Sequence, residues 1–108
     1  MALPTGINTN EDILRALQAA APYVGAIFRE DAAIRVTDKE KLLTYVPGRE
    51  LDIRVTEGTP ITPRMERCIK EDRIDTYQVE KEKYGFPIKV INVPIHGVHG
   101  EAIGMISA

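Results

Sequence analysis

Residues 86–108, FPIKVINVPIHGVHGEAIGMISA, carry the strongest strand signal in the chain. Apolar residues alternate through the first half, and a glycine-rich turn separates it from EAIGMISA, the last expected strand. The apolar positions change phase at Val90 and Ile91, which predicts either a bulge or a strand buried on both faces there. Residues 73–79, RIDTYQV, form a candidate edge strand. Three sequential strands should therefore pair as antiparallel neighbours.

Working outward from this segment, the pattern predicts two helices. The first covers Thr9–Phe28, where apolar residues recur at helical spacing and Thr9 can cap the first turn. Pro22 is expected to kink this helix or to break it into two. The second covers Pro63–Glu71, with Thr62 as its cap and the proline at its first position.

The segments between the helices complete the pattern. Residues 32–48, AAIRVTDKEKLLTYVPG, predict a hairpin that turns at residues 38–41. Residues 49–63, RELDIRVTEGTPITP, are expected as an extended segment that runs into a shaped loop. The order of elements predicts an α+β fold: an antiparallel sheet of about five strands, with an N-terminal helix and a short helix packed over one face.

Composition narrows the classes of function. The chain has 108 residues, the size of one domain, and its net charge of −2 offers no basic field for nucleic acid. The single cysteine, Cys68, cannot form an internal disulfide. No apolar run approaches the roughly 20 residues that cross a bilayer, and no secretory signal is visible. We therefore expect a cytoplasmic domain that contacts neither nucleic acid nor membrane.

The reactive side chains favour a domain that is not an enzyme. His96 and His99 lie in a glycine-rich turn, and a metal site would need further ligands, so we expect a plain hairpin turn and no metal. Cys68 shares a helical face with Met65 and Ile69, which is typical of a buried structural thiol. No nucleophile or phosphate-binding motif is present. The sequence names no cofactor.

A ligand cavity is expected between the sheet and the segment Leu51–Ile69, which can form a lid. Alternation allows only one of the pairs Ile34/Val36 and Arg35/Thr37 to point inward, and we favour the apolar pair as core. Tyr45 and the Thr59–Thr62 loop then become the polar contacts. Apolar walls are expected from Ile34, Val36, Ile88 and Val90 among others. The candidate ligand-binding residues are Tyr45, Thr59, Thr62, Met65, Ile69 and Tyr77.

These residues also carry a family resemblance. The motifs VTDKEK, YVPGRELD, GTPI, YGFPI and the hairpin VPI…GEAIG resemble the N-terminal PAS/Cache-like sensor domain of soluble bacterial methyl-accepting chemotaxis proteins. The similarity runs from Asp12 to Ala108, and its motifs are moderately specific. The turn HGVHG departs from the family, whose members usually carry an Asp- or Asn-containing polar turn there. The resemblance therefore assigns no shared site to the two histidines.

The resemblance implies a PAS-like fold and a single sensor domain, residues 1–108, excised from a longer signalling protein. Its function would be that of a ligand-sensing input domain of a chemoreceptor-type signal transducer, passing a conformational change to a C-terminal signalling helix. The expected partners are a small-molecule ligand of unknown identity and a second copy of the chain, paired through the stripe from Ile13 to Val24. The alternatives are a dimerisation or interaction module, or the input domain of a histidine kinase or transcription regulator.

Overall fold

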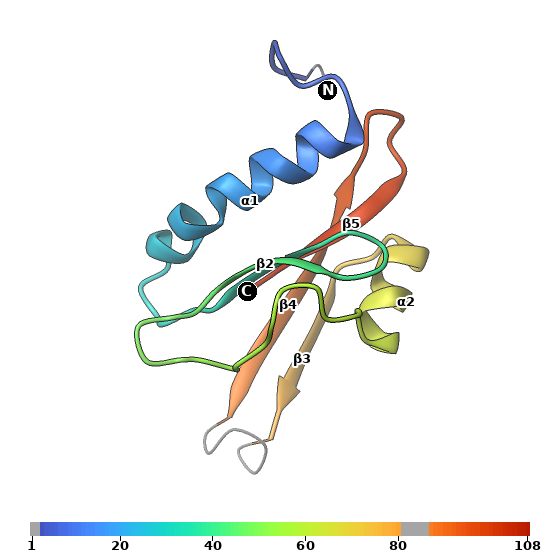
Figure 1. The fold of residues 1–108 in the computed structure, drawn as a ribbon. Coiled ribbons are helices and arrows are strands. Elements are labelled where there is room, and N and C mark those ends of the chain that lie inside the picture. The colour runs from blue at the N-terminus through green and yellow to red at the C-terminus, as the bar shows by residue number, and fades with distance from the viewer. Residues whose placement is uncertain (1–2, 81–86) are drawn as a thin grey trace.

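The protein is described by a computed structural model that covers residues 3–80 and 87–108. Its elements follow the expected order: α1 (Asn10–Ile27), β1 (Ile34–Thr37), β2 (Leu42–Val46), α2 (Pro63–Glu71), β3 (Asp75–Val79), β4 (Ile88–His96) and β5 (Ala102–Ser107). The strands form one antiparallel sheet in the order β2-β1-β5-β4-β3 (Figure 1). The predicted α+β class is confirmed. Phe86, which the sequence placed in a strand, lies outside the described residues.

The sheet is centred on β5, the last strand. The expected meander is confirmed, because β3, β4 and β5 are antiparallel neighbours. In addition, β5 pairs with β1, and Arg35 lies opposite Ser107 across that pair. The β3–β4 register runs without a break past Val90, so the phase change there marks no bulge. The register shift comes later: Ile95 pairs with Gly104 but His96 pairs with Ala102, which leaves one extra residue in β5.

Each face of the sheet has its own apolar cluster. One cluster lies under α1 and joins residues of the helix, β1, β4 and β5: Ala21, Ile34, Val36, Ile95 and Ile103. The other lies under α2 and comprises Met65, Cys68, Ile69 and Met105. The extra residue in β5 allows this one strand to supply Ile103 to the first cluster and Met105 to the second.

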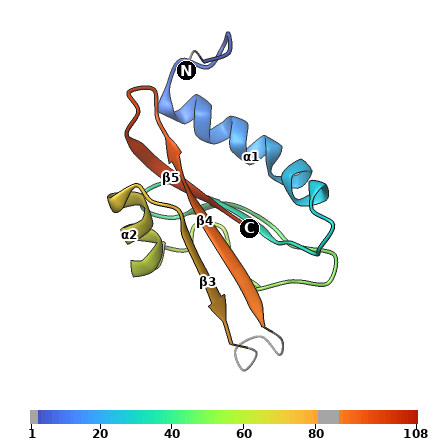
Figure 2. The ribbon, with the colours of Figure 1, turned by 180° about the vertical axis from the view of Figure 1, so that it is seen from behind.

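The two helices therefore cover opposite faces of the sheet (Figures 1 and 2). The expectation that both would pack over one face is corrected in this detail. The reason lies in the strands: β1 turns Ile34 and Val36 toward α1 and Arg35 and Thr37 toward the other face, and Thr37 is also fully buried. Both faces of the sheet therefore carry side chains that must be buried, and α1 covers only one of the two faces.

The ends of α1 follow the sequence closely. The Thr9 hydroxyl accepts a hydrogen bond from the Asp12 amide, and the Asp12 carboxylate accepts one from the Thr9 amide, which is a capping box. Pro22 lies inside the helix but does not divide it into two. The apolar stripe that includes Ile13 and Val24 packs against the sheet. These residues, which were expected to pair two copies of the chain, therefore belong to the domain's own core.

Caps also fix α2 as predicted. Thr62 accepts from the Met65 amide, and Pro63 occupies the first turn. The helix ends at Asp72, whose φ of 52° is left-handed. Cys68 is buried, its thiol lies 3.1 Å from the Arg73 carbonyl, and burial raises its pKa. Neither described helix has the length and apolar character that crossing a bilayer requires.

Residues 47–62 connect β2 to α2 and are called the lid from here on. They form no strand, although residues 51, 53 and 55 keep the predicted alternation of half-buried and exposed positions. A single bridge between Lys41 and Pro60 ties the lid to the β1–β2 turn. The turn itself is confirmed, since the Asp38 carboxylate accepts from the amides of Glu40 and Lys41.

Candidate ligand-binding site

A cavity of about 430 Å³ lies between the lid and the sheet, on the face that α2 covers. This volume is in the range of small-molecule sites. The apolar wall is made by both the lid and the strands, chiefly by Leu51, Ile53, Val55, Met65, Val79, Ile88 and Val90. The polar lining comprises Glu30, Asp31, Arg35, Thr62, Tyr77, Lys89 and Ser107. The predicted position of the cavity, between the sheet and the segment Leu51–Ile69, matches this arrangement.

A row of polar residues crosses the sheet on this face. Backbone pairing places one residue of each strand side by side, in the order Asp75, Asn92, Ser107, Arg35 and Tyr45. Strand alternation turns all five side chains to one face because neighbouring residues in register point the same way. Two members of the row, Arg35 and Ser107, line the cavity and supply its floor with hydrogen-bonding groups.

Arg35 is the positively charged member of the row. Its Nη2 donates to Ser107 Oγ at 2.8 Å, in a part-buried position. Among the described residues, no carboxylate lies within 4 Å of the Arg35 guanidinium. A guanidinium has five N–H donors in a planar fork, so one bond to a neutral hydroxyl satisfies only part of it.

Asn92 adds a buried amide beside Ser107. The residue has no exposed surface, and neither its Oδ1 nor its Nδ2 has a hydrogen-bond partner in the described part of the chain. A buried polar group without a partner costs about 1–3 kcal/mol. The row thus contains two groups, the Arg35 guanidinium and the Asn92 amide, whose hydrogen-bonding capacity the described residues do not fill.

Tyr77 forms an aromatic wall that its neighbours hold in place. The Arg64 guanidinium lies 3.9 Å from the ring centroid and donates two hydrogen bonds to Asp75, at 2.7 and 3.1 Å. These bonds lower the pKa of the Asp75 carboxyl and raise that of Arg64. The arrangement orients the ring by a cation–π contact from outside and leaves its surface as part of the cavity lining.

Asp31 anchors the start of the lid. Its carboxylate accepts hydrogen bonds from the amides of Arg49, Glu50 and Leu51, and the Arg49 side chain lies 3.9 Å away. These amides lower the pKa of the Asp31 carboxyl. Because the residue belongs to the connection between α1 and β1, one carboxylate links the lid to both elements.

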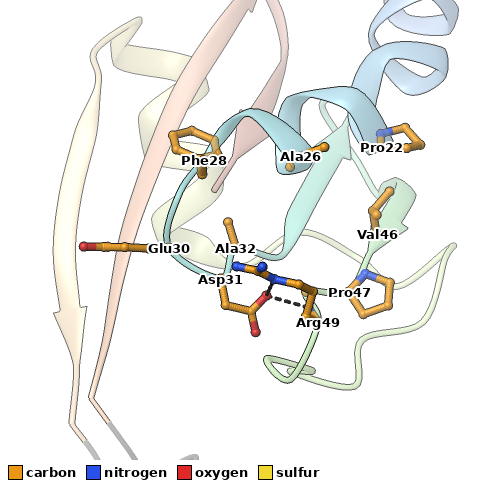
Figure 3. A pocket seen from close by; sticks show the side chains of 11 residues that line it. Pro22, Ala26, Phe28, Glu30, Asp31, Ala32, Val46, Pro47 and Arg49 are labelled. Atoms are coloured by element: carbon orange, nitrogen blue, oxygen red, sulfur yellow. Dashed lines mark hydrogen bonds and ion pairs between the residues drawn. The ribbon is translucent and has the colours of Figure 1, made fainter.

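A second hollow of about 380 Å³ lies beside this anchor, at the end of α1 (Figure 3). Pro22 and Val46 line it from α1 and β2, and Asp31 with Arg49 closes one side. It shares the segment from Phe28 to Ala32 with the larger cavity. The connection after α1 therefore forms a common wall of both spaces.

Tyr45 supports the lid and does not line the cavity. Its hydroxyl donates to Asp52 Oδ1 at 2.7 Å and accepts from the Ile53 amide at 3.0 Å. Burial, together with the Asp52 carboxylate, raises the pKa of Tyr45, and the same bond lowers the pKa of Asp52. Both hydrogen bonds of the Tyr45 hydroxyl thus go to the lid, where one of them holds the backbone of Ile53, a residue that lines the cavity.

The six residues predicted to bind a ligand divide into two groups. Thr62, Met65 and Tyr77 line the cavity. Tyr45 holds the lid, Ile69 packs into the cluster under α2, and Thr59 bonds through its backbone to Leu42. Ile34 and Val36 face α1 and line nothing here. The favoured interpretation thus missed Arg35 and Ser107. The alternation in β1 was the signal that could have found Arg35, whereas Ser107 joins it only through the pairing of β5 with β1.

The two histidines lie at the far end of the β4–β5 hairpin. His96 Nε2 is 2.7 Å from Asp72 Oδ1, so this ring bridges β4 to the end of α2. Within residues 3–80 and 87–108, no three His, Cys, Asp or Glu side chains gather as metal ligands would. In the turn itself Gly100 has a positive φ, as expected, but Gly97 does not.

No protein-family model matches the chain. Over 103 residues it is 33% identical to a Bacillus subtilis (strain 168) protein named "Putative sensory transducer protein YfmS"; the match covers 91% of this chain and 36% of that protein. The chain thus spans about a third of the length of this curated relative. The match thus relates this chain to part of a protein that is named as a sensory transducer. The narrower resemblance to chemotaxis receptors stays a prediction.

Among solved structures, the chain resembles a type II free methionine-R-sulfoxide reductase from Thermoplasma acidophilum. The TM-score is 0.60 at 18% identity, over 91% of this chain and 73% of that one. At this identity the likeness shows the fold alone. That protein has a GAF-like fold, and GAF-like folds are related to PAS-like folds. The structural likeness therefore agrees with the predicted PAS-like architecture.

Proposed function

We propose that the chain is a ligand-sensing input domain of a chemoreceptor-type signal transducer, and that it binds its ligand without transforming it. One observation carries the proposal: the cavity under the lid has apolar walls and a floor where the half-buried Arg35 guanidinium has hydrogen-bonding capacity that the described residues do not fill. The similarity to part of a sensory transducer supports the same function. As expected from the sequence, the proposed location is the cytoplasm.

The proposed signal leaves the cavity by two routes. A ligand that shifts the lid acts on Asp31 through its three amide bonds, and so on the end of α1. A ligand that engages Ser107 acts on the end of β5, the strand that leads toward the proposed C-terminal signalling helix. Binding would select one of two arrangements of these elements in proportion to its preference for that arrangement.

A thermal-shift screen of a metabolite library tests this proposal. Compounds that raise the melting temperature should lose their effect in Ala33→Phe, because Ala33 lines the cavity and a phenyl ring would fill part of it. The matched control is Ala26→Phe, since Ala26 lines only the second hollow. Retained binding in Ala33→Phe with loss in Ala26→Phe would move the site to that hollow. A library without any stabilising compound would count against ligand sensing.

The second candidate is an interaction module that pairs two copies of its parent protein. A specific observation favours it: Tyr23 and Ile27 lie on the outer face of α1 and are 73% and 79% exposed. They are one helical turn apart, so they form one apolar patch. A histidine kinase or a transcription regulator would fit this candidate and the sensing proposal equally, and the parent gene beyond Ala108 would separate these outputs.

A further inference from the structure

The cavity floor contains a positive charge that the described residues leave without a counter-ion. Arg35 is half-buried, and its one hydrogen bond goes to the neutral oxygen of Ser107. Of the carboxylates that line the cavity, Asp31 is occupied by three lid amides, and Glu30 is exposed. Removing a charge from water is costly unless a partner of opposite sign is supplied. The partner that fits is an anion.

The surroundings of this charge define the rest of the ligand. The bond from Arg35 occupies an acceptor lone pair of Ser107 and leaves the hydroxyl proton free to be donated. A carboxylate accepts two parallel N–H bonds from a guanidinium and can accept a hydroxyl proton besides. Opposite this polar end, the lid offers the apolar side chains of Leu51, Ile53 and Val55, and its polar lining residue, Thr62, already accepts a hydrogen bond from the Met65 amide.

From this arrangement we infer that the cavity binds a small organic acid. Its carboxylate lies on Arg35 and Ser107, and its apolar body lies between the lid and the Tyr77 wall. Lys89, which also lines the cavity, adds to the positive potential at its exposed end. This inference rests on the proposed sensing function and names the chemical class that the same site selects.

The test uses pairs of compounds of nearly equal shape, a carboxylate and its neutral amide. Benzoate, hexanoate and succinate are compared with benzamide, hexanamide and succinamide by titration calorimetry on the whole chain. We expect at least one acid to bind about 10- to 100-fold more tightly than its amide, and Arg35→Gln to remove that preference. Arg54→Gln is the matched control, because this substitution removes the same charge from a lid residue that does not line the cavity.

The outcomes separate this inference from the function on which it rests. If no acid binds, or if acids and amides bind equally, the organic-acid class is wrong. Neutral hits from the metabolite screen that depend on Ala33 would then leave ligand sensing intact. If neither acids nor library compounds bind, both fail together.

A second readout needs no ligand. Arg35→Met removes the uncompensated charge and should leave the melting temperature of the free chain unchanged or raised, as substitutions in binding sites often do. A fall of more than about 5 °C would show that Arg35 serves the fold through Ser107, and would overturn the inference.

Discussion

Asp31 shows how much one side chain can organise in this domain. Replacing it with asparagine keeps the shape but removes the charge that three lid amides share. We expect Asp31→Asn to lower the melting temperature by a few degrees, and to increase amide exchange at residues 49–51. Glu50→Gln, which makes the same charge change one residue along the lid, should have little effect. Equal melting temperatures for both variants would contradict the anchoring role.

The same residue predicts a pH dependence. Its folded pKa lies below the ordinary value of 3.8 because the lid amides favour the charged form. A depressed carboxyl pKa contributes stability that is fully present above the unfolded value and is lost as pH falls through the folded one. The difference in melting temperature between wild type and Asp31→Asn should therefore be constant above about pH 5. This difference in melting temperature should become smaller below pH 3.8. A difference that grows there would contradict a lowered pKa for Asp31.

Gly104 is required for a different reason, the close approach of two strands. A Cβ at this position would collide with the carbonyl oxygen of Thr37 on β1. Gly104→Ala should therefore cost about 3 kcal/mol of unfolding free energy, measured by urea denaturation. Gly58→Ala is the comparison: its Cβ meets nothing, so only the positive φ is penalised, by about 1 kcal/mol. Similar losses for both would mean that β1 and β5 separate easily.

For single residues, the sequence predicted the helix caps better than it predicted the lining of the ligand-binding cavity. Thr9 and Thr62 were identified because capping depends on local geometry that a few neighbouring residues determine. Arg35 was set aside because only one face of β1 was assumed to be buried. With α1 and the lid on opposite faces, Ile34 and Arg35 both point inward, each to its own side. Alternation along a strand says which residues share a face but does not say how many faces are covered.

At the scale of elements, one side-chain contact joins the end of α2 to β4. His96 and Asp72 are both about half exposed, so the pair should contribute at most about 1 kcal/mol. We therefore expect the double variant His96→Asn, His99→Asn to keep nearly wild-type stability and ligand response in denaturation and thermal-shift assays. Asp72→Asn, which suits the left-handed backbone there, should behave alike.

Added zinc tests whether the histidines of the β4–β5 turn bind a metal. Added Zn²⁺ should leave the melting temperature of the wild type unchanged if His96 and His99 are only turn and bridge residues. A zinc-dependent rise that disappears in the double variant would establish a metal site at the hairpin.

The whole molecule raises the question of pairing. The stripe from Ile13 to Val24 was expected to pair two copies, and it packs instead on the sheet. Tyr23 and Ile27 on the outer face are the better candidates, so Tyr23→Glu with Ile27→Glu should convert a dimer to a monomer in light scattering. Lys39→Glu, on the exposed β1–β2 turn, is the charge control. A wild type that is monomeric at high concentration would remove this proposal.

The element order could be predicted from the sequence, but the strand order could not. Adjacent pairing of β3, β4 and β5 follows from short connections. The pairing of β1 with β5 joins residues 72 positions apart, from Arg35 to Ser107, and no local pattern reports it. The cavity depends on that pairing, because its polar floor runs across both strands. Its position under the lid could be predicted, whereas its chemistry could not.

The central place of β5 also bears on how the chain is made. A ribosome delivers α1, β1 and β2 first, and β3 and β4 later, but neither half of the sheet can join the other before β5 emerges. Until then β1 and β4 each expose an open hydrogen-bonding edge and an uncovered apolar surface. The nascent protein should thus bind chaperones until Ser107 has left the exit tunnel, and then close its sheet in a single late step.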